Sequence, residues 1–192
     1  SPSISLENKK MKKSSHDNIH SDGNILPPTT PSEEAHRLNI IVDTREQTPF
    51  LFFDYPCSTS AGTLHTGDYS VSGFESRILI ERKSLADLAS CMTSGRDRFE
   101  RELERMRPFE SACVIVEEPL TAIRHSGYRS NLNPRSFEQS ILSFSTRYRV
   151  PFLFGHNRAH AEWLAFNVLR HFWNKNVPSR DRIPFVESPP SA

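Results

Sequence analysis

A short apolar strand that ends in three charged residues constrains this chain more than any other stretch. Residues 76–80 form an apolar, β-rich run, and the chain then changes abruptly to Glu81, Arg82 and Lys83 before a helical pattern begins at Ser84. Because side chains alternate along a strand, Glu81 and Lys83 share one face and Arg82 points to the other. A carboxylate and an ammonium side by side at a buried strand end contribute little to packing, so the pattern indicates chemistry.

Strand and helix patterns alternate along the chain after residue 76, which predicts an α/β fold with a mixed central sheet flanked by helices and partly parallel central strands. Gly73 allows a hairpin turn into the strand that ends at Glu81. The expected strands are residues 39–42, 63–66, 69–71, 76–81, 112–116 and 150–154, and residues 47–61 are expected to be a loop. The expected helices are residues 84–92, 96–106, 135–147 and 157–173.

The composition fits one globular domain with tails. The 192 residues are 36% hydrophobic and 24% charged, an ordinary balance for a chain that buries a core. Residues 1–37 are rich in Ser, Pro, Asn and Lys and predict a disordered tail, residues 38–175 predict the domain, and the Pro-rich residues 176–192 predict a flexible tail.

Cysteine usage and hydropathy bear on the compartment. The three cysteines match no disulfide or zinc framework, and no signal-peptide pattern opens the chain. No apolar run approaches the roughly 20 residues that span a membrane. We therefore expect an intracellular protein without a membrane partner, in the cytoplasm or nucleoid of a prokaryote or the nucleus of a eukaryote.

Three acids at or near strand ends suggest a metal site. Asp43, Asp68 and Glu81 offer the hard oxygen ligands that Mg²⁺ or Mn²⁺ prefers. Lys83 could position an attacking water or offset charge on a phosphate in the transition state, so the set fits phosphodiester hydrolysis. The alternative is a surface ion pair between Glu81 and Lys83, which would stabilise the fold by only ~0 to 1 kcal/mol.

Several motifs resemble those of the XPF-type nuclease domain, whose signature is GD followed by ERKxxxD. They are IVDTRE ending at Glu46, GDY at residues 67–69, IERKSLAD ending at Asp87, and the Gly95-Arg96 pair, and the resemblance extends over residues 39–173. It implies a restriction-endonuclease-like fold and a divalent metal. It also implies cleavage of branched, flap or fork DNA, or of DNA at single-strand/double-strand junctions, in repair or recombination.

The same resemblance implies roles for individual residues. Asp43, Asp68 and Glu81 match the metal-site acids, and Lys83 matches the catalytic lysine. Asp68, Glu81 and Arg82 are expected to be catalytic as well. Arg45 is a plausible phosphate contact, and Glu46 could hold a metal-bound water. Arg96 matches a supporting position, as does Asp87, which could orient Lys83 or Arg82; simple charge complementarity at a helix start explains Asp87 nearly as well.

The chain also departs from the family pattern. Eukaryotic and many archaeal family members carry a tandem helix-hairpin-helix module or a helicase, and we expect neither in the fewer than twenty residues given after Trp173. Glu100 stands where relatives often have Gln. In the loop of residues 125–133, Tyr128 and Arg129 could stack on or clamp DNA, or could belong to a mobile surface loop.

The last expected helix is broadly apolar, and the resemblance implies a homodimer through the C-terminal helices. The alternative is that Trp163 and Trp173 pack into the domain's own core. The leading hypothesis is a Mg²⁺-dependent endodeoxyribonuclease. The alternatives are a catalytically silent DNA-binding or scaffolding subunit of a nuclease heterodimer, and a nuclease for plain duplex DNA or RNA.

Overall fold

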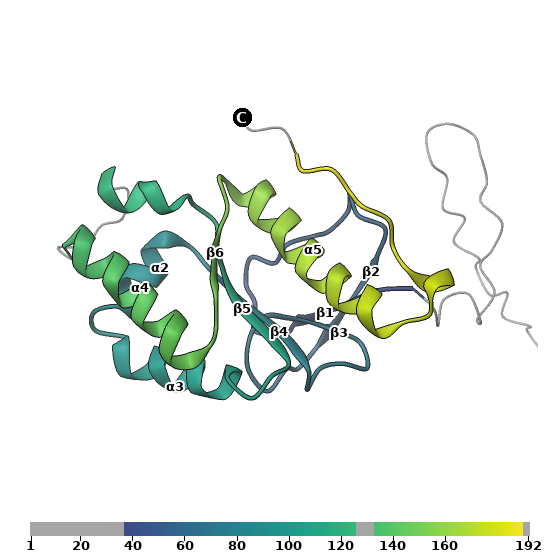
Figure 1. The fold of residues 1–192 in the computed structure, drawn as a ribbon, viewed down its shortest axis with the longest axis horizontal. Helices are drawn as coiled ribbons and strands as arrows, with labels where there is room; N and C mark the ends of the chain where they lie inside the picture. Colours follow the sequence, from purple (N-terminus) through teal and green to yellow (C-terminus); the bar gives the residue numbers. More distant parts are fainter. Residues whose placement is uncertain (1–36, 126–132, 190–192) are drawn as a thin grey trace, which may run out of the picture. The chain divides into compact units, whose positions relative to one another are not determined.

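A mixed six-stranded sheet organises the domain. Figure 1 shows how the helices are arranged around it. The computed structural model describes residues 37–125 and 133–189. The strands are β1 (Asn39–Asp43), β2 (Ser58–Gly62), β3 (Tyr69–Val71), β4 (Ile78–Lys83), β5 (Ser111–Val116) and β6 (Phe152–Phe154), in the order β2-β1-β3-β4-β5-β6. The β1/β3 and β3/β4 pairs are antiparallel, and the β1/β2, β4/β5 and β5/β6 pairs are parallel.

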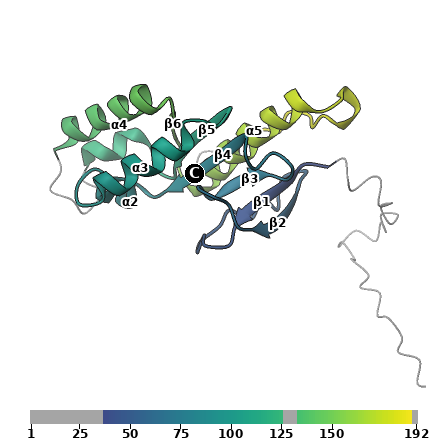
Figure 2. The same ribbon diagram turned by 90° about the horizontal axis from the view of Figure 1, so that it is seen from below.

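Helices cover both faces of the sheet, which confirms the predicted α/β class. They are α2 (Leu85–Cys91), α3 (Arg96–Met106), α4 (Pro134–Tyr148) and α5 (Arg158–Asn176), with short 3₁₀ helices at Leu120–His125 and Ser179–Asp181. Figure 2 shows α2, α3 and α4 gathered together, away from α5. Within the described ranges, no helix combines the length and the apolar character needed to cross a bilayer.

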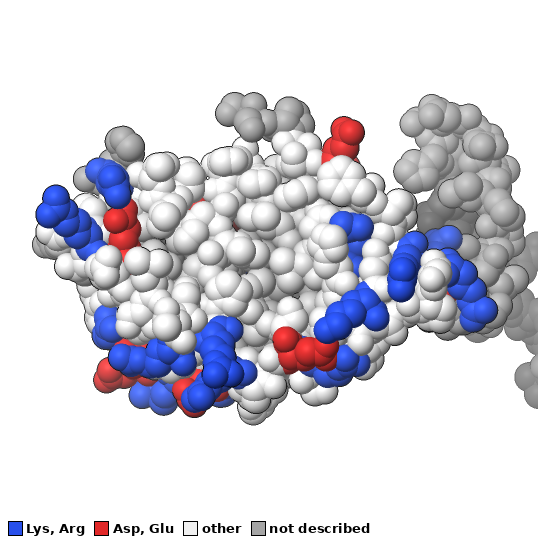
Figure 3. Space-filling view, viewed as in Figure 1, with Lys and Arg blue, Asp and Glu red and all other residues white. Residues whose placement is uncertain are grey.

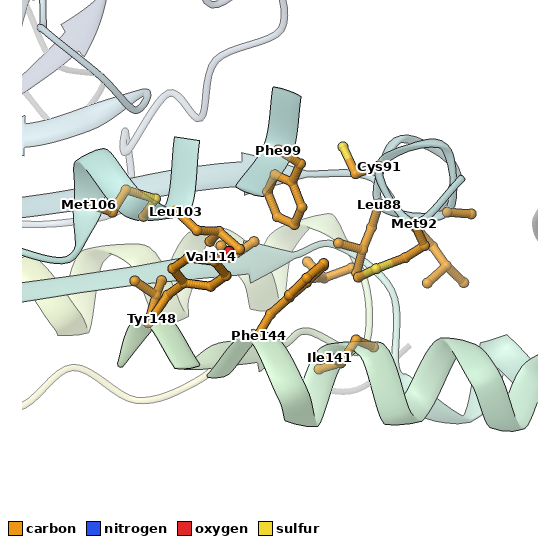
Figure 4. Close-up of a cluster of buried hydrophobic side chains, with 14 of the residues drawn as sticks. Leu88, Cys91, Met92, Phe99, Leu103, Met106, Val114, Ile141, Phe144 and Tyr148 are labelled. Carbon is orange, nitrogen blue, oxygen red and sulfur yellow. The ribbon is translucent and has the colours of Figure 1, made fainter. Parts of the chain in front are cut away.

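The buried side chains form two clusters, one on each face. The first lies between the sheet and α2, α3 and α4, and Figure 4 shows its centre, where Phe99, Leu103 and Met106 of α3 meet Phe144 and Tyr148 of α4. The second lies between the sheet and α5 and contains Tyr69, Ile80 and Phe166. Two successive residues of β4, Leu79 and Ile80, therefore belong to opposite clusters, as strand alternation requires.

Local signals placed most helix boundaries correctly. The Ser84 hydroxyl accepts a hydrogen bond from the Asp87 amide and caps α2, while Asn133 and Asn157 cap α4 and α5 in the same way. Pro134 opens α4, where its missing N–H has no intrahelical partner to lose. The stripe of Phe99, Leu103 and Met106 is buried as expected.

Two predictions near the N-terminal half of the domain are wrong. Residues 63–66 do not form a strand, and the predicted loop of residues 47–61 instead contains most of β2, which pairs with β1. Strand β2 is an edge strand of mostly exposed polar residues, so it lacks the apolar alternation by which a strand is recognised.

The C-terminal segment, predicted as a flexible tail over residues 176–192, contacts α5. Residues 177–189 return along α5, and the Asn174 side chain both donates to the carbonyl of Ile183 and accepts from its amide. The Trp163 indole donates to the carbonyl of Val186, and the Trp173 indole to that of Asp181. Both tryptophans therefore contact the chain's own residues. The predicted tail of residues 1–37 lies, apart from Arg37, outside the described residues.

Candidate active site

Three acids lie in a row across neighbouring strands. The amide of Asp43 donates to the carbonyl of Asp68, and the amide of Asp68 donates to the carbonyl of Ile80, both at 2.8 Å. Continuing the β1/β3 and β3/β4 registers by one residue sets Asp43, Asp68 and Glu81 level with one another. Because their neighbours Val42, Tyr69 and Ile80 pack toward α5, the acids project toward α3.

Gly67 makes the approach to Asp68 possible. Its φ is +77°, and a Cβ there would lie 2.5 Å from Cδ1 of Leu79. Only glycine combines this backbone conformation with such close contact at low cost. The Gly-Asp pair of the sequence is therefore a backbone requirement as well as a source of a carboxylate.

Burial sets the proton affinities of two of the acids. It raises the pKa of Asp68 to about 6, although the Arg82 backbone N–H, which donates to Oδ2 at 2.7 Å, works in the opposite direction. Burial also raises the pKa of Glu81 well above its usual value, against the attraction of Lys83 and with repulsion from Asp68. A cation between these carboxyls would favour their charged forms.

Lys83 is held by three groups. Its Nζ lies 2.6 Å from Oε1 of Glu81, 3.5 Å from Oε2 of Glu102 and 5.0 Å from the centre of the Phe99 ring. Burial alone would lower the pKa of Lys83, but Glu81 and Glu102 raise it above its usual value. The side chain is only 11% exposed, so a positive charge is held next to Glu81.

Asp43 is already engaged by its neighbours. One oxygen accepts from Nε and the amide of Arg45, and the other accepts from Nη2 of Arg45 and the amide of Leu64. Burial by itself would raise the pKa of Asp43, but these hydrogen bonds hold it below its usual value. In this arrangement Asp43 positions Arg45, whose side chain is 63% exposed, and can bind a metal only after Arg45 moves.

Arg82 faces away from Lys83, as strand alternation predicted. Its guanidinium donates to Glu46 at 3.0 and 3.2 Å, to Glu117 at 2.7 Å and to the Thr48 hydroxyl at 2.7 Å. Glu117 also accepts from Arg158 at the start of α5. Arg82 thus links the ends of different strands through its pairs with Glu46, after β1, and Glu117, after β5. Arg82 and Glu46 also line the cleft.

The remaining predicted residues are spread around the site. Asp87 accepts from the Ser84 hydroxyl at 2.7 Å, so its described hydrogen bonds belong to the helix start rather than to Lys83 or Arg82. Arg96 pairs with Glu100 and lies over the Phe144 ring. Tyr128 and Arg129 lie outside the described residues.

The acids open into a cleft of about 480 Å³. Its lining includes Asp43, Asp68, Glu81, Arg45, Glu46, Asp87, Glu102 and Arg105. A neighbouring hollow of about 490 Å³ is lined in part by Lys83, Cys91 and Arg98. Sequence reasoning missed Glu102, Arg98 and Arg105, which lie on α3.

A sequence signal for Glu102 did exist. Glu102 follows the buried Phe99 by three residues, so it flanks the apolar stripe of α3 on the same side of the helix. Glu100, the residue singled out from the sequence, turns instead toward α4, where it accepts from Tyr148 at 2.9 Å.

The carboxylate oxygens of the site suit a cation that binds few protein ligands and takes its other ligands from water and substrate. Hydrogen bonds among the described residues use Oδ2 of Asp68 and Oε1 of Glu81, and leave the second oxygen of each for another ligand. In residues 37–125 and 133–189, no three His, Cys, Asp or Glu side chains form a ready-made metal cluster. Mg²⁺ commonly binds through one or two carboxylates together with substrate phosphates.

The chain is similar to a known protein family and to solved structures. A family model described as the ERCC4 domain matches residues 42–166. The fold is similar to that of XPF from Aeropyrum pernix, with a TM-score of 0.58, 20% identity, and coverage of 70% of this chain and 64% of that one. A structure of XPF from Aeropyrum pernix in complex with DNA gives a TM-score of 0.58 at 20% identity, with 74% and 68% covered. The chain therefore spans about two thirds of the length of these structures, and no curated protein sequence matches it significantly.

Proposed function

This chain belongs to the ERCC4 domain family, and from that premise we propose that it is a Mg²⁺- or Mn²⁺-dependent endonuclease that cuts branched, flap or fork DNA in repair or recombination. The family match and the shared fold confirm the predicted resemblance to the XPF-type nuclease domain. Membership in a family of DNA nucleases supports the proposed reaction class, and the residues of the cleft support the rest of the proposal.

One observation carries the proposal: the buried carboxyl of Glu81, the partly buried carboxyl of Asp68 and a fixed lysine meet at one edge of the sheet. Asp68 and Glu81 have raised pKa values, and Nζ of Lys83 lies 2.6 Å from Glu81. An exposed ion pair placed for stability would not need this burial. Perturbed carboxyls in a cleft are typical of sites that bind a cation or move a proton.

The roles of the residues follow from their positions. Asp68 and Glu81 would hold the metal, with Asp43 joining them if Arg45 moves onto a phosphate. The metal would lower the pKa of a bound water and offset charge on the phosphate. Lys83 would place its ammonium against the phosphate oxygens while the water oxygen bonds to phosphorus and the P–O bond to the leaving ester oxygen breaks. The water loses one proton in this step, and the leaving oxygen gains one to become a hydroxyl.

Arginine side chains around the cleft offer contacts for the DNA backbone. Arg45 and Arg105 line the cleft, Arg98 lines the neighbouring hollow, and all three are exposed. Arginine binds phosphate oxygens through two parallel hydrogen bonds, so these side chains suit the path of a strand toward Lys83. The known complex of XPF from Aeropyrum pernix with DNA supports DNA as the partner.

We further propose that the protein forms a homodimer through the face that carries α5. Figure 3 shows few charged side chains over the central part of this face, while Lys and Arg gather along its lower margin. Phe185, in the C-terminal segment that returns along α5, is 69% exposed. Depletion of charge in the core of a patch is typical of protein interfaces.

A catalytically silent subunit is the second candidate. Degenerate subunits in this family usually lose the Glu-Arg-Lys residues, whereas Glu81, Arg82 and Lys83 are all present here. Binding of a DNA fork without cleavage, together with no metal binding by calorimetry, would favour this candidate.

The proposal is tested by incubating the protein with labelled fork, flap, duplex and single-stranded DNA, and with RNA, in Mg²⁺ or Mn²⁺. We expect nicking of the fork or flap, and loss of nicking by at least about 100-fold in Lys83→Ala. Lys175→Ala removes the other lysine of the domain, which forms an exposed pair with Glu110, and should cut normally. A wild-type protein inert on every substrate with both metals would overturn the proposal.

A further inference from the structure

Glu102 lies beside the acids without belonging to their row. It projects from α3, whereas Asp68 and Glu81 come from the sheet, and its side chain is 20% exposed. Its Oε2 lies 3.5 Å from Nζ of Lys83, and it shares the lining of the cleft with the three acids. A helix residue thus reaches the lysine from the side opposite the strand.

Lys83 needs this second contact because its stem is flexible. A lysine side chain carries a compact charge on four methylenes, so its position depends on the groups around the ammonium. The Phe99 ring, whose centre lies 5.0 Å from Nζ, supplies an apolar surface, and Glu81 supplies a carboxylate two residues away on the same strand. Phe99 and Glu102 are one helical turn apart, so α3 contributes two of the three contacts.

Glu81 and Glu102, the two carboxylates that pair with Lys83, have different roles in the proposed reaction. Glu81 is a proposed metal ligand, and a cation on its carboxylate weakens the attraction between Glu81 and the ammonium. Glu102 pairs with Lys83 from outside the acid row, so its attraction persists when the row is occupied. A lysine held by Glu81 alone would be loosened at the step that uses it.

We propose that Glu102 is a positioning residue that keeps the Lys83 ammonium over the phosphate when the acid row holds its metal, an inference that rests on the proposed nuclease function. Glu102 acts through Lys83 and is not itself a proposed metal ligand. Glu104, two residues further along α3, provides a contrast, because it is 59% exposed and pairs with Arg107 on the surface.

The kinetic test compares Glu102→Gln, Glu102→Asp and the control Glu104→Gln on a DNA fork. We expect Glu102→Gln to lower kcat by about 10- to 100-fold, the usual effect of removing a residue that orients a site group. KM, and the Kd for the same fork in Ca²⁺ without cleavage, should change less than about twofold, which separates positioning from DNA binding. Glu102→Asp should recover part of kcat, and Glu104→Gln should match wild type. Unchanged kcat in Glu102→Gln would overturn the proposal.

A second test needs neither metal nor activity. Protein labelled with ¹³C at lysine Cε gives one NMR signal for each lysine, and Lys83→Arg identifies the signal of Lys83. In the metal-free protein, Glu102→Gln should shift or broaden that signal, and Glu104→Gln should leave it in place. An unmoved Lys83 signal would overturn the positioning role even in an active enzyme, whereas an inactive wild type with a shifted signal would sink only the nuclease proposal.

Discussion

The backbone amide of Arg82 donates a 2.7 Å hydrogen bond to Oδ2 of Asp68, and so ties the carboxyl of one strand to the backbone of its neighbour. This bond orients Asp68 beside Glu81 and leaves its other oxygen for another ligand. The carboxyl is nevertheless buried enough that its pKa rises to about 6. The metal-free fold therefore contains a carboxylate that would be more stable in water.

Asp68→Asn should stabilise the metal-free protein at pH 8. The pKa of Asp68 is about 6 in the folded state and about 4 when unfolded, so the folded state binds more protons between these pH values. Stability from this group is therefore highest below pH 4, falls as pH rises to 6, and stays low above. Urea unfolding should give Asp68→Asn a free energy of unfolding roughly 1 to 3 kcal/mol above wild type at pH 8, and no advantage near pH 4. Glu75→Gln, at an exposed site, is the control. If Asp68→Asn and wild type differed in free energy of unfolding by the same amount at both pH values, the prediction would be contradicted.

Mg²⁺ should reverse the order of stability of the same two proteins. A ligand that binds only the folded state raises Tm, and the proposed ligands include the carboxylate that Asp68→Asn removes. Thermal unfolding at pH 8 should show a Tm that rises with Mg²⁺ for wild type, stays nearly constant for Asp68→Asn, and returns to its starting value with EDTA. Equal shifts in both proteins would place the cation elsewhere.

Arg82→Ala should destabilise the domain by about 3 kcal/mol or more. The change leaves Glu46, whose side chain is 6% exposed, without its cation, and an unpaired buried charge is costly. Glu117 also loses Arg82 but keeps its pair with Arg158. Arg124→Ala, which breaks the exposed pair with Glu138, should cost less than about 1 kcal/mol. Urea unfolding measures both. If adding Glu46→Gln to Arg82→Ala recovers no stability, the loss of the Arg82–Glu46 pair is not the cause of the destabilisation.

The sequence predicted those features whose causes are local. Caps at Ser84 and Asn157, and the stripe of Phe99, Leu103 and Met106, are fixed by neighbours within a turn or two of helix. Alternation along β4 likewise placed Glu81 and Lys83 together and Arg82 apart. These parts of the fold and site could be read without knowledge of the tertiary structure.

Features that depend on distant partners could not be predicted in this way. Strand β2 is polar and forms because β1 offers it a ladder of hydrogen bonds. The engagement of Asp43 depends on Leu64, 21 residues away, and Glu102 joins the site only because α3 packs against β4. The sequence of segment 177–189 shows no helix or strand periodicity from which its position could be predicted. Side chains of α5 bind its backbone instead.

Gly67→Ala should be more destabilising than Gly73→Ala, although both glycines have φ near +80°. Each change incurs the backbone cost of about 1 to 2 kcal/mol for a left-handed conformation. At Gly67 the new Cβ also meets Leu79 at 2.5 Å, whereas nothing lies within 4 Å at Gly73. Urea unfolding should therefore place Gly67→Ala at least about 1 kcal/mol below Gly73→Ala. Equal losses would mean that Leu79 moves aside freely.

Asn174→Ala should release the C-terminal segment from α5. The amide of Asn174 donates to the carbonyl of Ile183 at 2.7 Å and accepts from its N–H at 2.8 Å, so one side chain satisfies both backbone groups. Arg170 also donates to the carbonyls of Ile183 and Pro184, and Trp163 donates to that of Val186, but neither side chain accepts from the N–H of Ile183. We expect a loss of about 1 to 3 kcal/mol in urea unfolding and faster amide exchange at Ile183. Lys175→Ala, next along the helix and 71% exposed, should change the free energy of unfolding by less than about 0.5 kcal/mol. Because Leu164 and Val168 pack in the cluster that includes Ile183 and Val186, unchanged exchange at Ile183 would mean that apolar contact alone holds the segment.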